Sequence, residues 1–214
     1  MKAAKGFTLV ELLVVLGIIA ILSAASIGGF SFVTRRAEQA KGRELVSNTA
    51  TALGALLQAQ HRWPPSLLQE AQGGGILTAR AAACLAVNKL MSLSYTTMDD
   101  DGETVYTLSG LDRCGIVSPW ATAVLKKSGP NESALNKKVP SGGSVSDHRL
   151  HFALDDDGDG ITEVRLKSKT LRIRGNCAVW SWGRNGVEDD YGASMDSRGA
   201  ADDIFSWSRN QEVR

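Results

Sequence analysis

Glu11 is the first residue whose type and position suggest chemistry, because it stands alone in an apolar run. Apart from Glu11, no charged side chain occurs between Lys5 and Arg35. Residues 12–33 would form a helix about 33 Å long, which is enough to cross the hydrocarbon core of a bilayer. A carboxylate near the middle of a bilayer costs about 2.5–3.5 kcal/mol on insertion scales, so this one requires a partner or a use.

A second candidate for chemistry is an acidic loop in the last third of the chain. The first half of an EF-hand calcium loop is matched by Asp155, Asp157, Asp159 and Gly160. The second half does not match, because Leu166 stands where that loop needs a bidentate glutamate. Both flanks have the pattern of strands, so a tight hairpin turn is the favoured interpretation and calcium binding is the alternative.

The residue types common in catalytic sites form no recognisable set. The histidines are His61, His148 and His151. The last two are three residues apart at the start of a predicted strand, which places them on opposite faces and disfavours a shared metal. The sequence has no GxSxG motif, no P-loop and no dinucleotide-binding glycine pattern. We therefore expect no enzymatic activity, and a cysteine–histidine pair is the remaining catalytic alternative.

The composition is that of a globular chain. The 214 residues are 43% hydrophobic and 22% charged, which allows one apolar anchor and one soluble domain. The net charge of +1 gives no ground for a nucleic-acid partner or a disordered charged tail. The cysteines Cys84, Cys114 and Cys177 form no CxxC pair, so neither zinc nor thioredoxin-type chemistry is indicated. Outside the cytoplasm they would form one disulfide, and all three pairings stay open.

One long helix, predicted over residues 8–61, must position Glu11. Its first half is hydrophobic on all sides, and its second half has an apolar face whose residues recur at spacings of three and four. This face comprises Leu45, Val46, Ala50, Leu53, Leu56 and Leu57. The Trp-Pro-Pro sequence at 63–65 ends the helix, because proline disfavours helical geometry in the preceding residue. Gly42 is an expected weak point.

The rest of the chain predicts helices and short strands. Residues 69–75 are predicted as a glycine-rich loop, residues 77–93 as a helix, and residues 128–146 as the most loop-like stretch. Strands are predicted over 104–108, 149–154, 161–166, 171–174 and 177–182. Turn-forming residues separate these strands, as in an antiparallel meander.

The N-terminus resembles the signature of type IV pilins and of the pseudopilins of type II secretion systems. That signature is a short basic leader ending in glycine, then Phe-Thr-Leu-x-Glu and about twenty apolar residues. Here Gly6 ends the leader, Phe7 follows and Glu11 completes the motif, so every position is filled. The alternative is a cleaved secretory signal with small residues at 23–25, but the length of the apolar run and Glu11 count against it.

The resemblance implies how this N-terminus is processed and used. A prepilin peptidase would cut between Gly6 and Phe7 at the cytoplasmic face, and the new amine would be N-methylated. Glu11 would pair with the cationic N-terminal amine of a neighbouring subunit. Its charge would therefore be paired only when neighbouring subunits stack at one particular axial offset. The alternative partner is the amine of its own Phe7, and the two pairings suit different stages of assembly.

Two further stretches resemble the major pseudopilins. Residues 118–120 (SPW) are similar to their Asp-Pro-Trp-Gly turn. Residues 180–207 resemble their C-terminal loop, which reads roughly Ser-x-Gly-x-Asp-Gly, a spacer, then Asp-Ile-x-x-Trp. Asn185 stands in that loop where an aspartate is usual.

The resemblance implies that this loop binds calcium. Calcium takes six to eight oxygen ligands, from carboxylates, amide carbonyls and the backbone. The implied ligands are Asn185, Asp202 and Asp203, with the backbone of Trp182. Further candidates in the spacer are Asp189, Asp190 and Asp196. The alternative is a solvated acidic loop whose end is anchored by Trp207.

We therefore predict an α+β, type IV pilin-like chain, in which a long N-terminal spine helix packs on a small antiparallel β-sheet head. The expected divisions are a cleaved leader (1–6), a transmembrane or fibre-core helix (7–33), an amphipathic helical half (34–62) and a periplasmic head (63–214). The resemblance implies a pseudopilin, a structural subunit of the periplasmic pseudopilus of a type II secretion system. It would cross the bacterial inner membrane once before entering a periplasmic or extracellular fibre.

The implied partners are the protein itself, other pseudopilins, the prepilin peptidase and the inner-membrane assembly platform. Two alternatives stay open. One is a minor pilin of a surface type IV pilus. The other, of a different class, is a membrane-tethered domain that binds calcium or another ligand and uses the pilin signal only for export.

Overall fold

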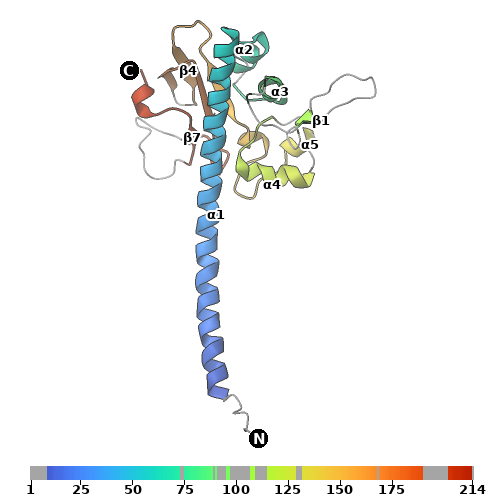
Figure 1. Ribbon diagram of the computed structural model, residues 1–214, viewed down its shortest axis with the longest axis vertical. Helices are drawn as coiled ribbons and strands as arrows, with labels where there is room; N and C mark the ends of the chain where they lie inside the picture. The colour runs from blue at the N-terminus through green and yellow to red at the C-terminus, as the bar shows by residue number, and fades with distance from the viewer. Residues whose placement is uncertain are drawn as a thin grey trace. The chain divides into compact units, whose positions relative to one another are not determined.

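The computed structural model describes residues 9–72, 75–88, 90, 95–96, 107–108, 115–128, 132–167, 169–189 and 202–213. The chain divides into two compact units, Met1–Glu38 and Gln39–Arg214, and each is described by itself. The element order is shown in Figure 1.

Helix α1 (Leu9–Gln60) confirms the long helix predicted over residues 8–61. In the first unit, its large apolar side chains from Leu9 to Leu22 are all exposed, with fractions between 45% and 78%. Farther along, the Arg36 guanidinium lies 5.0 Å from the centre of the Phe32 ring, one turn earlier. Among the residues that the structure describes, no helix combines the length and hydropathy of a membrane-spanning segment.

In the second unit, the C-terminal half of α1 supplies part of the core. Val46, Leu53 and Leu56 are almost fully buried, which confirms the predicted apolar face. Gly42 is a close contact rather than a weak point: a Cβ there would lie 2.7 Å from Ile204 Cδ1. The missing side chain lets the helix approach Ile204 and Trp120 from distant parts of the sequence.

Short helices surround this part of α1. They are α2 (Pro65–Gln72), α3 (Ala79–Val87), α4 (Pro119–Ser128), α5 (Glu132–Leu135) and the 3₁₀ turns η1 (Ser146–His148) and η2 (Arg209–Gln211). The loop predicted over 69–75 is wrong up to Gln72. Pro65 has the φ angle that a first helical residue needs, and burial of Leu67 holds the helix to the core.

Three other predictions of local structure need correction. The helix expected over 77–93 is shorter, since α3 ends at Val87, and residues 89 and 91–93 lie outside the described part of the chain. The turn expected at 118–120 is the beginning of α4, again with proline at the first helical position. The loop-like stretch 128–146 contains α5.

In the described part of the chain, the strands form three small antiparallel sheets. These pair β1 (Tyr95–Thr96) with β2 (Thr107–Leu108), join β3 (His151–Leu154), β6 (Cys177–Ser181) and β7 (Ile204–Phe205), and pair β4 (Ile161–Arg165) with β5 (Thr170–Arg174). The predicted strand positions are confirmed within about three residues, except that residues 104–106 lie outside the described ranges.

The predicted meander is wrong, because β3 pairs with β6 and not with its neighbour β4. His151 lies opposite Trp180, and Leu154 lies opposite Cys177. The β4–β5 hairpin forms a second small hydrophobic cluster, which includes Val164, Ile173, Trp180 and Trp207. Burial of this apolar face draws the hairpin away from the edge of β3.

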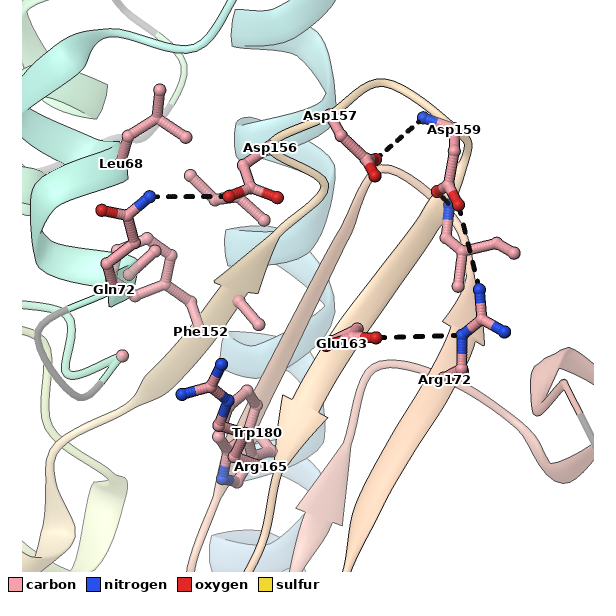
Figure 2. Close-up of a pocket in the computed structure, with 15 residues that line it drawn as sticks. Leu68, Gln72, Phe152, Asp156, Asp157, Asp159, Glu163, Arg165, Arg172 and Trp180 are labelled. Atoms are coloured by element: carbon pink, nitrogen blue, oxygen red, sulfur yellow. Dashed lines mark hydrogen bonds and ion pairs between the residues drawn. The ribbon is translucent and has the colours of Figure 1, made fainter.

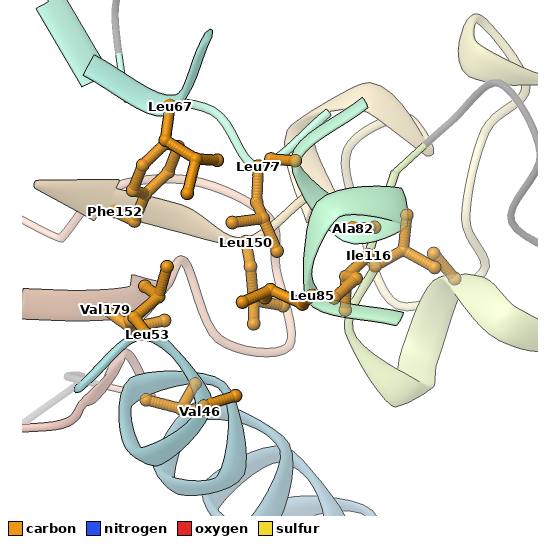
Figure 3. Packing of buried hydrophobic residues seen from close by; sticks show 14 of the residues in the cluster. Val46, Leu53, Leu67, Leu77, Ala82, Leu85, Ile116, Leu150, Phe152 and Val179 are labelled. Atoms are coloured by element: carbon orange, nitrogen blue, oxygen red, sulfur yellow. The ribbon is translucent and has the colours of Figure 1, made fainter. Parts of the chain in front are cut away.

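The main core joins α1, α2, α3 and β3. Leu150, Phe152 and Leu154 alternate with more exposed residues and face the interior, as expected for a half-buried strand. Figure 3 shows Leu150 and Phe152 among side chains from these helices, including Leu53 and Leu67.

His61 ends α1 in a conformation that costs free energy. It has φ of 55° and its N–H donates to the Leu57 carbonyl, which is the geometry of a helix end that glycine usually occupies. We expect His61→Gly to raise the free energy of unfolding by about 0.5–1 kcal/mol. The free energy gained by removing the left-handed strain is larger than the cost of the extra backbone entropy that glycine loses on folding. Gln60→Gly, one residue earlier, should instead lower it by about 1 kcal/mol. Denaturant titrations that show both variants destabilised alike would contradict this account.

Candidate functional site

The residues predicted for processing and assembly lie before or just after the first described residue, Leu9. Gly6 and Phe7 fall outside the described residues. Glu11 lies exposed in the first turn of α1, where the positive end of the helix dipole favours a carboxylate. This position gives the charge a local source of stabilisation and leaves it accessible on an apolar helix surface.

The C-terminal loop is built around the side chain of Asp202. One of its carboxylate oxygens, Oδ2, accepts the N–H groups of Arg184 at 2.6 Å and Asn185 at 3.2 Å. Gly183 has positive φ, and a Cβ there would overlap the backbone of Asp202. Residues 183–186 therefore form a tight turn that closes onto Asp202 from about twenty residues away in sequence.

Three carboxylates meet beside this turn. One oxygen from each of Asp189, Asp202 and Asp203 lies within 4.8 Å of the others. The N–H of Asp202 donates to Asp189 Oδ2, and the N–H of Asp189 donates to Asp203 Oδ2, both at 3.1 Å. The second oxygen of Asp202, Oδ1, is buried and has no hydrogen-bond donor in the described part of the chain. A buried carboxylate oxygen beside two further carboxylates has the chemistry of a hard-cation ligand set.

The predicted ligands are only partly brought together. Asp202 and Asp203 meet as expected. The side-chain oxygen of Asn185 accepts the N–H of Val187 at 2.7 Å, and the Trp182 carbonyl accepts the N–H of Gly186 at 3.0 Å. Both oxygens thus accept a backbone N–H within the turn. Asp189 takes a central place that its position in the spacer did not indicate, and Asp190 and Asp196 lie outside the described residues.

The second acidic loop folds as a self-contained turn. Both oxygens of the buried Asp155 carboxylate accept backbone N–H groups, from Gly158 at 2.7 Å and Gly160 at 2.8 Å. Asp157 and Asp159 each accept the N–H two residues later. Oxygens of the three aspartates lie within 4.8 Å of one another, as the calcium alternative requires. The turn is not that of a hairpin, because β3 and β4 do not pair.

A buried serine–histidine pair was not singled out from the sequence. Ser118 Oγ lies 3.0 Å from His148 Nδ1, and His148 Nε2 lies 2.9 Å from the Gly142 carbonyl. The carbonyl can only accept, so Nε2 carries the proton and Nδ1 accepts from the serine hydroxyl. Burial lowers the pKa of His148. Both side chains are at most 1% exposed, so this pair links the start of α4 to the 142–148 loop.

The two described cysteines are unpaired thiols in this structure. Burial raises the pKa of Cys177 to about 11 and also raises that of Cys84, with a further contribution from the charge of Glu70. A raised thiol pKa disfavours the thiolate that a nucleophile needs. Because both thiols are free, the Cys84–Cys177 pairing is not formed, and Cys114 lies outside the described residues.

His151 belongs to an aromatic layer next to the C-terminal loop. Its ring stacks on Trp180 at 5.5 Å between centroids and lies 4.9 Å from Trp182. Burial lowers the pKa of His151 to about 4, and the charge of Arg149 contributes further. The neutral imidazole is thus the form that packs.

This burial predicts a loss of stability in mild acid. Above the unfolded-state pKa of about 6.5 the group has no effect, and as the pH falls toward 4 the unfolded chain takes up a proton that the folded chain does not. We expect the cost to approach about 3 kcal/mol at pH 4. His151→Phe should lessen the decline in melting temperature between pH 7 and 4.5, with the buried His148 contributing to the decline that remains, and His61→Asn at an exposed site should not lessen it. Parallel decline in the wild type and His151→Phe would contradict this assignment.

The comparisons with known proteins concern the N-terminus. Residues 1–27 match the prokaryotic N-terminal methylation motif. This match supports the type IV pilin signal inferred from Gly6, Phe7 and Glu11, and with it processing by a prepilin peptidase. No curated protein and no solved structure matches the chain.

Proposed function

We propose that this protein is a pseudopilin, a structural subunit of the periplasmic pseudopilus of a type II secretion system. The observation that carries the proposal is the N-terminal methylation motif over residues 1–27, on a helix whose large apolar side chains from Leu9 to Leu22 are all exposed. The motif supports a pilin-like protein, and the secretion role is the further step.

The exposed apolar side chains supply the driving force for assembly. Burial of apolar surface yields roughly 25 cal/mol per Å², so several exposed leucines and valines between Leu9 and Leu22 favour a bilayer or a bundle of like helices over water. In the inner membrane these side chains face lipid, and in the fibre they face neighbouring subunits. The apolar attraction has no preferred register, and the pairing of Glu11 with a neighbour's N-terminal amine supplies one.

The C-terminal loop favours a secretion pseudopilus over a surface pilus. Its end carries Asp202, Asp203 and the largely buried Trp207, in the order that the resemblance to major pseudopilins implies. The alternative is a minor pilin of a surface type IV pilus. The N-terminal motif fits that role as well, but the C-terminal loop does not favour it.

We also propose that this loop holds calcium. The fit rests on the buried, unsatisfied Oδ1 of Asp202 and on the approach of Asp189 and Asp203. The ion would supply the positive charge that three neighbouring carboxylates lack, while Asn185 and the Trp182 backbone shape the turn beside it. Without the ion, mutual repulsion of the carboxylates favours opening of the loop.

Removal of Glu11 tests the assembly role. We expect Glu11→Ala to mature and to enter the membrane as well as the wild type or better, because a charge is removed from an apolar helix. It should nonetheless be largely excluded from sheared fibres, since the register-setting pair is lost. Gly6→Ala is the matched control: it should block processing, so mass spectrometry should find no methylated Phe7. Incorporation of mature Glu11→Ala at the wild-type level would rule out the pairing.

Chelation tests the calcium proposal. Addition of EGTA should lower the melting temperature of the full chain by several degrees, and excess calcium should restore it, because an ion bound only by the folded state stabilises it. Asp202→Asn should abolish this calcium response. Asp157→Asn, in the other acidic loop, should retain it. A melting temperature indifferent to EGTA would refute calcium binding, and loss of the response in Asp157→Asn alone would move the site to that loop.

A further inference from the structure

A cleft of about 530 Å³ opens between α2 and the β4–β5 hairpin, apart from the C-terminal loop. Leu68, Ala71 and Gln72 of α2 form one wall, and outward-facing residues of the hairpin form the other. Figure 2 shows Leu68 and Gln72 of the helix on one side and Glu163 and Arg172 on the other, with Trp180 and Arg165 overlapping in the lower part of the view. The volume lies within the usual range for ligand sites, and no feature of the proposed fibre role uses this cleft.

The cleft lies along an unpaired strand edge. In the described residues β4 has β5 as its only strand partner. The far side of β5 is occupied, since Ile173 bridges Glu212 and the Val213 N–H donates to the Arg172 carbonyl. The open edge of this small sheet is therefore β4, whose Ile161, Glu163 and Arg165 line the cleft. Such an edge presents backbone donors and acceptors to another extended chain.

The floor contains a donor without an acceptor. Trp180 is about 4% exposed, and its indole N–H has no hydrogen-bond partner in the part of the chain that the structure describes. Buried polar groups normally have a partner, because the loss of water must be offset. The indole N–H is enclosed by the protein, so Trp180 offers the cleft an aromatic surface, and a ligand would reach the N–H only after the side chain shifts.

The charges along the cleft are unequal. Its lining includes the carboxylates of Asp156, Asp157, Asp159 and Glu163 and the guanidinium groups of Arg165 and Arg172. Arg172 already lies 3.9 Å from both Asp159 and Glu163, which leaves less of its charge for a ligand. The exposed Asp156 and Asp157 thus make the turn end of the cleft acidic, as Figure 2 shows.

We propose that this cleft binds an extended peptide segment of a partner protein, which adds as a strand to the open edge of β4. Its backbone pairs with β4, and a lysine or arginine side chain meets Asp156 and Asp157. Strand addition of this kind obtains affinity from main-chain hydrogen bonds and specificity from side-chain contacts. The acidic end selects a basic partner and disfavours an acidic one.

The first test uses three labelled peptides with the purified full chain in detergent. The probe is fluorescein-labelled Val-Thr-Lys-Val-Thr-Val, which favours an extended conformation and carries one cation. The second peptide replaces lysine by glutamate, and the third keeps lysine but is N-methylated at alternate amides, which removes donors needed for strand pairing. We expect fluorescence anisotropy to show the first binding at least tenfold more tightly than either of the others.

Two pairs of variants localise the binding. Ala153→Trp fills the floor of the cleft and should weaken peptide binding at least tenfold. Its control, Thr170→Trp, adds the same side chain at an exposed β5 position outside the cleft lining and should bind normally. Asp156→Lys should reverse the preference between the lysine and glutamate peptides, and Glu44→Lys, an equal charge change on exposed α1, should not.

Different results would contradict the mode of binding and the location of the binding site. Absence of binding up to about 1 mM peptide, or equal binding of the N-methylated peptide, would overturn strand addition. Equal binding by Ala153→Trp, with circular dichroism and melting temperature like those of Thr170→Trp, would overturn the location. The peptide measurements do not depend on fibre assembly, and EGTA in the buffer keeps calcium out of the 155–160 loop, so the cleft and the proposed function are tested separately.

Discussion

Burial of the apolar face on the C-terminal half of α1 is the interaction on which the second unit depends. Leu53 and Leu56 lie in the same hydrophobic cluster as Leu67 of α2, Leu85 of α3 and Phe152 of β3. The three small sheets have few strands each, and isolated sheets of that size are marginal in water. The helix therefore serves as the common surface on which short elements form one core, while its large apolar side chains from Leu9 to Leu22 stay exposed.

The divergence of β3 and β4 illustrates how this core shapes the surface. Two strands joined by a six-residue turn (155–160) ordinarily pair, but the β4–β5 hairpin buries Val164 and Ile173 against Trp180 and Trp207. Adding this second cluster leaves β4 with an open edge. The cleft is thus a consequence of two competing demands, backbone pairing and apolar burial, in which burial determines the position of the hairpin.

The sequence predicted the long helix well because its evidence is local: an uncharged run, an apolar face of helical period and a Trp-Pro-Pro end. The strand positions followed from alternation in the same way. Pairing partners did not, because β3 meets β6 across more than twenty residues. Ser118 and His148 are likewise 30 residues apart in the sequence. Nothing in the sequence distinguished Asp189 from the other acidic residues of the spacer, and only the folded turn at Gly183 places it beside Asp202. Such contacts depend on tertiary packing, to which single-sequence patterns are insensitive.

The two acidic loops show why a count of aspartates does not identify a cation site. In the 155–160 loop, the buried Asp155 uses both carboxylate oxygens to accept backbone N–H groups, so the fold itself satisfies the charge. In the C-terminal loop, Asp202 uses one oxygen in this way, and the other is buried without a donor in the described chain. A carboxylate whose two oxygens both accept backbone N–H groups has its charge partly offset by the fold, whereas an oxygen buried without a donor beside two other carboxylates is stabilised by a cation. The distinguishing feature is a buried carboxylate oxygen with no donor in the described chain, and by that measure the C-terminal loop is the stronger candidate.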